Sequence, residues 1–172
     1  DVQFCDVLDE GGFDIILANP PYVRQEEIDK ACPGYKDQLN QCFPDIFAGR
    51  ADLLCYFYAR AVQLLKTGGA LVFISSNKWF KADYGRNLRD YLRKTCRIRQ
   101  IVDFGDLPVF EDATAYPMIF AAERLSNDAA SNANYTIRFA EPASLDPPYP
   151  GIREVVQAIG NDLPAGQILM DT

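Results

Sequence analysis

The chain has 172 residues, of which 48% are hydrophobic and 12% aromatic, enough apolar side chain for one domain with a buried core. Its net charge of -7 argues against the broad basic surface on which tight nonspecific nucleic-acid binding depends, although a local basic cluster occurs at residues 86–99. Five scattered cysteines and the absence of histidine make zinc sites and disulfide frameworks poor expectations, and no metal is expected.

Nothing in the sequence indicates a membrane or secreted protein. No segment approaches the roughly 18 consecutive apolar residues of a membrane helix, and no basic-then-apolar leader comes first. Reduced cysteines then fit a cytoplasmic protein. Because the chain begins with Asp1 and reaches a strand-like segment almost at once, we expect it to be part of a larger protein.

The first strong signal is a short apolar run at residues 13–18, which Asn19-Pro20-Pro21 ends. Such a run is typical of a buried parallel strand, and proline stops it because its ring removes a backbone donor. We therefore predict a central strand here. Residues 23–50 mix Gly, Pro and charged residues with little periodicity, so we expect a long loop, with one short helix at most.

Helical spacing begins after Asp52. Apolar residues recur at intervals of three and four up to Leu65, as a helix with one buried face requires, and Gly68-Gly69 should end it. Residues 70–74 predict a second buried strand. Residues 84–94 repeat the helical spacing, and residues 98–104 predict a third strand.

Two further strands are predicted at residues 116–122 and 135–139, joined as a hairpin by a polar turn. The order strand, helix, strand, helix, strand, hairpin predicts an α/β, doubly wound sheet with an antiparallel edge hairpin. We expect residues 1–141 to belong to one domain. Residues 142–172 are interpreted as a Pro- and Gly-rich linker to a following region, with a short helix beginning at residues 152–159.

The motif Asn19-Pro20-Pro21-Tyr22 carries the chemistry. In open α/β sheets, ligands bind beyond the carboxyl ends of the strands, which is where this motif falls. The exocyclic amine of adenine is a poor nucleophile, because its lone pair is delocalised into the ring. The amide oxygen of Asn19 and the carbonyl of Pro20 could both accept from that NH2 and free the lone pair, and two prolines would hold the carbonyl rigidly.

Tyr22 offers an aromatic face on which a base can stack once it has swung out of a duplex. No charged base is needed, since the product loses its proton easily, so the absence of histidine is no obstacle. The alternative is a proline-rich turn with a packed tyrosine. A second Pro-Pro-Tyr, at Asp146-Pro147-Pro148-Tyr149, lacks a preceding apolar strand and is interpreted as a linker turn.

On these residues the chain resembles the DNA adenine methyltransferases of restriction-modification systems. It is especially similar to type IIG enzymes, which join nuclease, methyltransferase and target recognition in one polypeptide. The resemblance covers about residues 1–140. It implies the C-terminal part of a Rossmann-like methyltransferase fold and transfer of a methyl group from S-adenosylmethionine to the N6 amine of adenine. It also implies double-stranded DNA with a flipped adenine as the partner, and target-recognition and possible nuclease regions elsewhere in the parent chain.

The resemblance implies further site residues. Asp6 stands where an acidic residue contacts the adenine amine of the cofactor, and an ordinary strand-end aspartate is its alternative. Asp52 stands where the family's next helix begins, so Asp52 and Asn19 are expected at the cofactor, with a plain helix start as the alternative for Asp52. Phe110 stands where a phenylalanine closes over the flipped base opposite Tyr22, and a core phenylalanine is its alternative.

The chain departs from the family in one respect. A Gly-rich loop that would cradle the methionine end of the cofactor is missing, and Gly11-Gly12 is a turn before the catalytic strand. We therefore expect the isolated chain to bind the cofactor poorly and to be inactive. Two alternative functions stay open: the same chemistry on RNA or on a protein glutamine, or a noncatalytic fragment that serves assembly. The DNA recognition sequence would be read by base contacts outside this chain.

Overall fold

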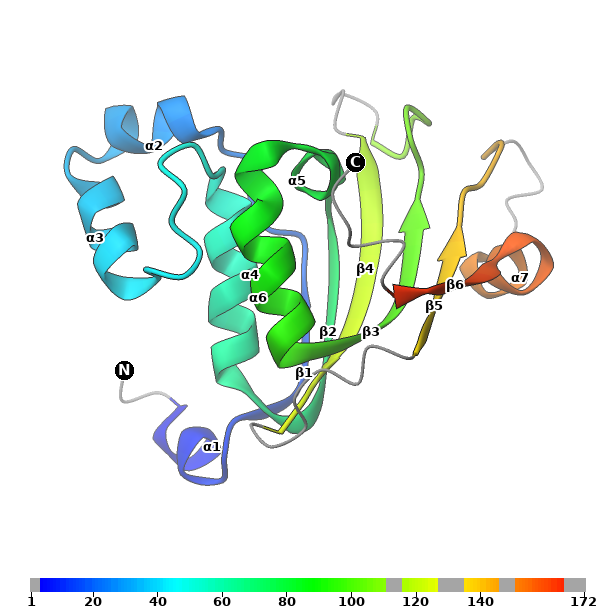
Figure 1. Ribbon diagram of the computed structural model, residues 1–172, viewed down its shortest axis with the longest axis horizontal. Coiled ribbons are helices and arrows are strands. Elements are labelled where there is room, and N and C mark those ends of the chain that lie inside the picture. Colours follow the sequence, from blue (N-terminus) through cyan, green and yellow to red (C-terminus); the bar gives the residue numbers. More distant parts are fainter. Residues whose placement is uncertain (1–3, 111–115, 127–134, 146–150, 166–172) are drawn as a thin grey trace.

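The computed structural model of the chain describes residues 4–110, 116–126, 135–145 and 151–165. Its frame is a six-stranded sheet in the order β1-β2-β4-β3-β5-β6 (Figure 1). The pairs β1–β2 and β3–β5 are parallel, and the pairs β2–β4, β3–β4 and β5–β6 are antiparallel. The strands are β1 (Phe13–Ala18), β2 (Leu65–Ser76), β3 (Cys96–Asp103), β4 (Pro117–Arg124), β5 (Thr136–Ala140) and β6 (Asn161–Pro164).

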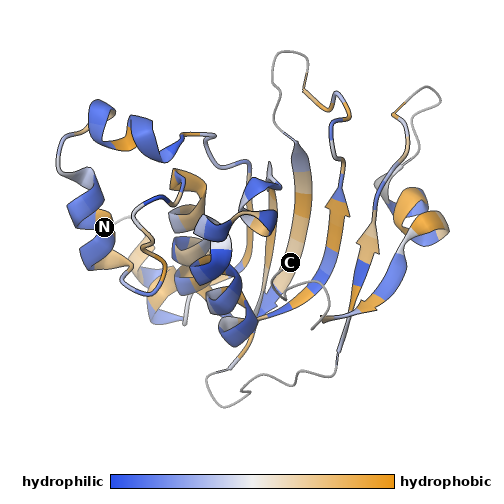
Figure 2. Ribbon diagram, turned by 45° about the horizontal axis from the view of Figure 1, so that its top comes forward, coloured by the Kyte–Doolittle hydropathy of each residue, from blue (hydrophilic) through white to orange (hydrophobic). Residues whose placement is uncertain are grey.

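Helices α4 (Leu53–Leu64) and α6 (Arg86–Thr95) cover one face of the sheet (Figure 1). They share a core with the strands, in which Tyr58 and Phe120 are fully buried. Helix α7 (Ile152–Ile159) packs against β5, where Val102 and Val156 belong to a second, smaller cluster. Figure 2 shows hydrophobic residues along the strands and hydrophilic residues on the outward turns of the helices. The remaining helices are short: α1 (Cys5–Asp9), α2 (Gln25–Ala31), α3 (Tyr35–Cys42), α5 (Lys78–Lys81) and the 3-10 helix η2 (Asp83–Gly85).

The sheet confirms the predicted α/β class but corrects the predicted hairpin. Strands β4 and β5 exist close to the predicted positions, yet they do not pair with each other. Instead β4 lies between β2 and β3, and β5 pairs with β3. The physical reason is that β4 carries apolar side chains on both faces, from Met118 to Ala122. Such a strand buries most apolar surface in the middle of a sheet, with a neighbouring strand on each edge.

Strand β1 has the predicted bounds and the predicted parallel partner, but it is not central among the described strands. It pairs with β2 on one edge, and no described residue pairs with its other edge. Ile15 is 61% and Leu17 70% exposed on the face away from α4. The apolar pattern of residues 13–18 therefore predicts burial on two faces, and the described residues bury only the face that carries Ile16 and Ala18.

Gly68 and Gly69 do not end helix α4, contrary to prediction. The helix ends at Leu64, and both glycines lie inside β2. Gly68 has a φ of 79°, and a Cβ on Gly69 would lie 2.9 Å from the carbonyl oxygen of Phe13. The glycine pair thus forms an irregularity of β2 that lets it approach β1 closely.

Two connecting regions are more ordered than the sequence indicates. Residues 23–50 hold two helices, α2 and α3, where a long loop was predicted. Helix α7 coincides with the predicted helix at residues 152–159, and β6 after it pairs with β5. The division between residues 1–141 and 142–172 stays a prediction, and the second Pro-Pro-Tyr at residues 146–150 lies outside the described residues.

Candidate functional site at the carboxyl edge of the sheet

Asn19 leaves the sheet at the carboxyl end of β1, the edge at which β2 and β3 also end. Its side chain is exposed and has no hydrogen-bond partner among the residues that the structure describes. The ring of the next residue, Pro20, is buried and anchors the turn, while Pro21 is exposed. The motif therefore presents a free amide from a fixed backbone.

Tyr22 and Phe110 face each other at this edge. Their ring centroids are 6.3 Å apart, and the ring planes meet at 75°, an edge-to-face contact. Tyr22 is 40% exposed, and partial burial raises the pKa of its hydroxyl above the ordinary value, so the ring is neutral near pH 7. The structure thus brings together the two aromatic residues that the sequence assigns to base stacking.

The two rings must move relative to each other before a planar ligand can lie between them. Neighbouring bases in DNA stack about 3.4 Å apart, so a base held between two rings separates them by about 7 Å. The observed 6.3 Å, with the planes at 75°, is the separation of two rings that touch edge to face, so no gap for a base is open between them. A base could enter only after one ring has turned to face the other and moved away from it.

Asp52 fastens the chain just after the motif. Its Oδ1 accepts a hydrogen bond from the backbone N–H of Gln25 at 3.0 Å, and Leu53 N–H donates to the carbonyl of Val23 at 3.1 Å. Asp52 thereby joins the first turns of α2 and α4, which confirms the predicted helix start. Its predicted contact with a cofactor stays a prediction.

The fold does not place Asp6 beside the other predicted site residues. It is exposed in the first turn of α1, and Gly12 N–H donates to the carbonyl of Val7 at 2.8 Å, so α1 folds against the amino end of β1. Asn19 lies beyond the opposite end of that strand (Figure 1). The cofactor role of Asp6 also stays a prediction.

A buried polar pair lies between helix α4 and the end of β2. The hydroxyls of Tyr58 and Ser75 are 2.9 Å apart, and both residues are fully buried. Burial raises the pKa of Tyr58, and its ring packs against those of Phe73, Trp79 and Phe120. This aromatic cluster fixes the end of β2 close to the motif.

Asn77 and Asp103 are buried polar residues of this edge that the sequence does not single out. Asn77 follows β2, Asp103 ends β3, and the amide Nδ2 of Asn77 donates to Oδ1 of Asp103 at 2.8 Å. The only feature of the sequence that could have pointed to them is the position of each polar residue directly at the end of a predicted buried strand. It is weak, because strand ends carry such residues for many reasons.

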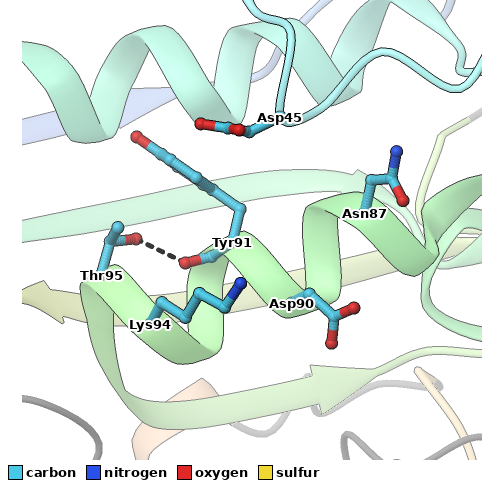
Figure 3. Close-up of a pocket in the computed structure, with 6 residues that line it drawn as sticks. All are labelled: Asp45, Asn87, Asp90, Tyr91, Lys94 and Thr95. Atoms are coloured by element: carbon cyan, nitrogen blue, oxygen red, sulfur yellow. Dashed lines mark hydrogen bonds between the residues drawn. The ribbon is translucent and has the colours of Figure 1, made fainter.

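A cavity of about 360 Å³ lies elsewhere, between α6 and the segment that follows α3 (Figure 3). It contains none of the predicted site residues. Within it Thr95 donates a hydrogen bond to the carbonyl of Tyr91 at 2.8 Å, so part of its polar lining is already paired. Its lining residues are Asp45, Asn87, Asp90, Tyr91, Lys94 and Thr95.

The family of the chain follows from its similarity to known proteins. Residues 1–110 match the Eco57I restriction-modification methylase family. The chain belongs to this family. It is 35% identical over 118 residues to the type II methyltransferase M.BstVI of Geobacillus stearothermophilus, which covers 67% of this chain and 20% of that protein. It is 28% identical over 116 residues to the restriction enzyme and methyltransferase RM.Eco57I of Escherichia coli, which covers 67% of this chain and 12% of that protein. The chain thus spans about a fifth of M.BstVI and less of RM.Eco57I.

Solved structures confirm the fold predicted for this methylase family member. A class I S-adenosylmethionine-dependent methyltransferase of Listeria monocytogenes superposes with a TM-score of 0.59 at 16% identity, over 80% of this chain and 39% of that one. The type IIG restriction endonuclease BpuSI superposes with a TM-score of 0.52 at 15% identity, over 77% of this chain and 15% of that one. At such identities the likeness shows the fold alone.

The acceptor groups of the site fit part of the cofactor that this methylase fold implies. S-adenosylmethionine carries amino and hydroxyl donors, and the free amide of Asn19 and the carboxylate of Asp52 can accept from such groups. Gly11, Gly12, Gly34 and Gly49 lie outside any strand-to-helix turn that could cradle its methionine end.

Most of the basic cluster of this methylase chain is committed to internal contacts. Arg89 is buried and donates to the carbonyls of Trp79 and Ala82, both at 2.9 Å, and Arg99 pairs with Glu123. Within the described residues, no helix is long and apolar enough to cross a membrane, and no group of His, Cys, Asp or Glu side chains could hold a metal ion.

Proposed function

We propose that this chain supplies the adenine-binding part of a site-specific DNA methyltransferase, which transfers a methyl group from S-adenosylmethionine to the N6 amine of adenine. The observation that carries the proposal is the free amide of Asn19, exposed at the carboxyl edge of the sheet beside a buried proline. An internal hydrogen bond would have removed that amide from any ligand.

The chain's contribution to the reaction is electrostatic. Asn19 Oδ1 and the carbonyl of Pro20 each accept a hydrogen bond from the adenine NH2, which localises the nitrogen lone pair and aims it out of the ring plane. The cofactor, when bound, supplies an electrophilic methyl group on a positively charged sulfur. Orientation of the amine in line with that methyl provides much of the acceleration.

Proton release needs no charged base. After transfer the amine bears a positive charge and is strongly acidic, so the same two acceptors can hold its protons until water takes one. Tyr22 is neutral and serves as a stacking surface, because partial burial raises its pKa further from pH 7. Asn19 and Asp52 would hold the amino side of the cofactor, with Asp6 as the further predicted contact.

The target base would lie between Tyr22 and Phe110. What supports this placement is that the two rings are neighbours beside the motif, in edge-to-face contact at 6.3 Å, so Phe110 can close over a base that stacks on Tyr22. Base-edge contacts that select the DNA sequence, and any nuclease activity, would belong to other regions of the full-length protein.

The acceptor class is tested with the full-length protein and S-adenosylmethionine that carries a labelled methyl group. Duplex DNA, RNA and a release factor with a methylatable glutamine are offered in separate reactions. We expect label in duplex DNA alone. Label only in RNA or only in protein would replace the DNA assignment by one of the alternative acceptors, and no label anywhere would favour a noncatalytic role.

A further inference from the structure

Asn77 contacts both flanks of the segment that carries Phe110. Its Nδ2 donates to Oδ1 of Asp103 at 2.8 Å, and its backbone N–H donates to the carbonyl of Tyr116 at 2.9 Å. Asp103 ends β3 directly before residues 104–110, here called the Phe110 segment, and Tyr116 directly precedes β4. Asn77, which directly follows β2, therefore holds both the end of β3 and the beginning of β4.

The carboxylate of Asp103 fixes the start of the Phe110 segment. Its Oδ1 also accepts from the N–H of Gly105 at 3.0 Å, and its Oδ2 lies 3.7 Å from Nζ of Lys81. The residue is only 4% exposed. A carboxylate buried to this extent is costly unless such partners surround it, so its presence here calls for a reason beyond packing.

Tyr116 holds a strained backbone at the other flank. Its φ of 43° is a left-handed conformation that is strained for an aromatic residue. The hydrogen bond from Asn77 holds its carbonyl, and Nζ of Lys78 lies 5.3 Å from its ring centroid. Strain of this kind persists only where the surrounding structure over-determines it, and it gathers at ligand sites.

The rest of the Phe110 segment transmits this anchoring to Phe110. Leu107 N–H donates to the carbonyl of Phe104 at 3.0 Å, and Val109 N–H donates to that of Leu107 at 2.8 Å. Leu107 and Val109 also pack on the smaller core cluster. The place of Phe110 opposite Tyr22 thus depends on where Asp103 holds the segment.

We infer that Asn77 and Asp103 are positioning residues, which hold the Phe110 segment so that Phe110 lies beside Tyr22 and can close over the target base. Neither residue touches the base; both act through Phe110. The inference rests on the proposed function for the identity of the ligand. It adds the contacts that place Phe110 opposite Tyr22.

The test compares four variants of the full-length protein: Asn77→Ala, Asp103→Ala, Asp103→Asn and Asn87→Ala. Asp103→Asn keeps an oxygen that can accept from Asn77 and Gly105. Asn87→Ala is the control, because the half-buried Asn87 also donates an amide hydrogen bond, to the carbonyl of Phe47 at 3.2 Å, but away from the Phe110 segment. Asn77→Ala is the milder of the two disruptive variants and serves if Asp103→Ala does not fold.

Two readouts are taken. Hydrogen–deuterium exchange of the Phe110 segment reports its anchoring without any need for activity. Fluorescence of 2-aminopurine at the target position of duplex DNA reports the trapped, flipped base. We expect Asn77→Ala and Asp103→Ala to exchange faster and to lower kcat about tenfold with a reduced fluorescence signal, as the loss of one buried hydrogen bond allows. Cofactor affinity should stay within about twofold, and Asp103→Asn should restore most of both readouts.

The outcomes separate the inference from the function on which it rests. Faster exchange with unchanged fluorescence and kcat would show a purely structural contact and overturn the inference, as would unchanged exchange in Asn77→Ala. A wild-type protein that gives no fluorescence change with any DNA would contradict the proposed function instead. The exchange data would then decide alone whether Asn77 and Asp103 hold the Phe110 segment.

Discussion

At the scale of single residues, the contact between Tyr22 and Phe110 is the feature that links geometry to recognition. The two rings come from segments far apart in sequence and meet edge to face at 6.3 Å. An aromatic pair that only filled space in the core would be buried, whereas Tyr22 is 40% exposed. A pair of which one ring is open to solvent, beside the motif, is better explained as a stacking site.

Phe110→Ala should therefore weaken trapping of a flipped base. Stacking on an aromatic side chain contributes about 1–3 kcal/mol per base, so fluorescence of 2-aminopurine at the target position should fall while overall DNA affinity changes less. Phe57→Ala is the matched control, since Phe57 is 41% exposed on helix α4 and is not part of the site. A Phe110→Ala protein with the fluorescence of the wild type would exclude the clamp.

At the scale of elements, the sequence predicts those helix and strand bounds that depend on short-range sequence patterns. The bounds of β1 are correct because a short apolar run ends at Asn19-Pro20, and α4 begins as predicted because its apolar spacing starts after Asp52. Helices α2 and α3 were missed, since each buries a single residue, Ile28 or Leu39, too little for a visible period. The irregularity of β2 at Gly68 and Gly69 depends on contact with β1, which lies outside any local window.

Asp52 joins two elements, and its structural and cofactor roles can be separated by experiment. Asp52→Asn keeps an acceptor for Gln25 N–H, so the free energy of unfolding should change by less than about 0.5 kcal/mol. Asp52→Ala removes that acceptor and should cost about 1 kcal/mol. If Asp52 also binds the cofactor through its charge, both variants should bind S-adenosylmethionine more weakly. Wild-type cofactor affinity in both, measured by calorimetry, would limit Asp52 to its structural role.

At the scale of the whole molecule, the pairing of strands was the hardest feature to predict. The sequence predicts five of the six strands, but the insertion of β4 between β2 and β3 depends on nonlocal contacts. The same holds for the site. Tyr22 and Phe110 were predicted from motif positions. Asn77 and Asp103 can be recognised as a pair only from the sheet order, in which β2 and β3 lie on either side of β4 and end at the same edge.

Folding stability should fall at alkaline pH. Burial raises the pKa of the Cys96 thiol from its ordinary 9.0 to about 11, and burial also raises the pKa of Cys55 and of Tyr58. The unfolded chain loses these protons first, so their contribution to stability is complete below about pH 9 and is lost as pH rises through about 11. Urea unfolding at about pH 8 and about pH 10.5 measures the difference. Cys96→Ala should reduce it, and equal or higher stability at the alkaline pH would contradict the burial of these groups.

The most direct measurement is the identity of the methylated atom and its dependence on Asn19. Full-length wild-type protein and an Asn19→Ala variant are incubated with S-adenosylmethionine and duplex DNA, and the digested nucleosides are analysed by mass spectrometry. Asn40→Ala is the control, because Asn40 is exposed on α3 and is not part of the site. The wild type and the control should yield N6-methyladenine, and Asn19→Ala should yield it about 10²–10³-fold more slowly, even at saturating S-adenosylmethionine. Methyl groups found on another atom, or an undiminished rate in Asn19→Ala, would contradict the account.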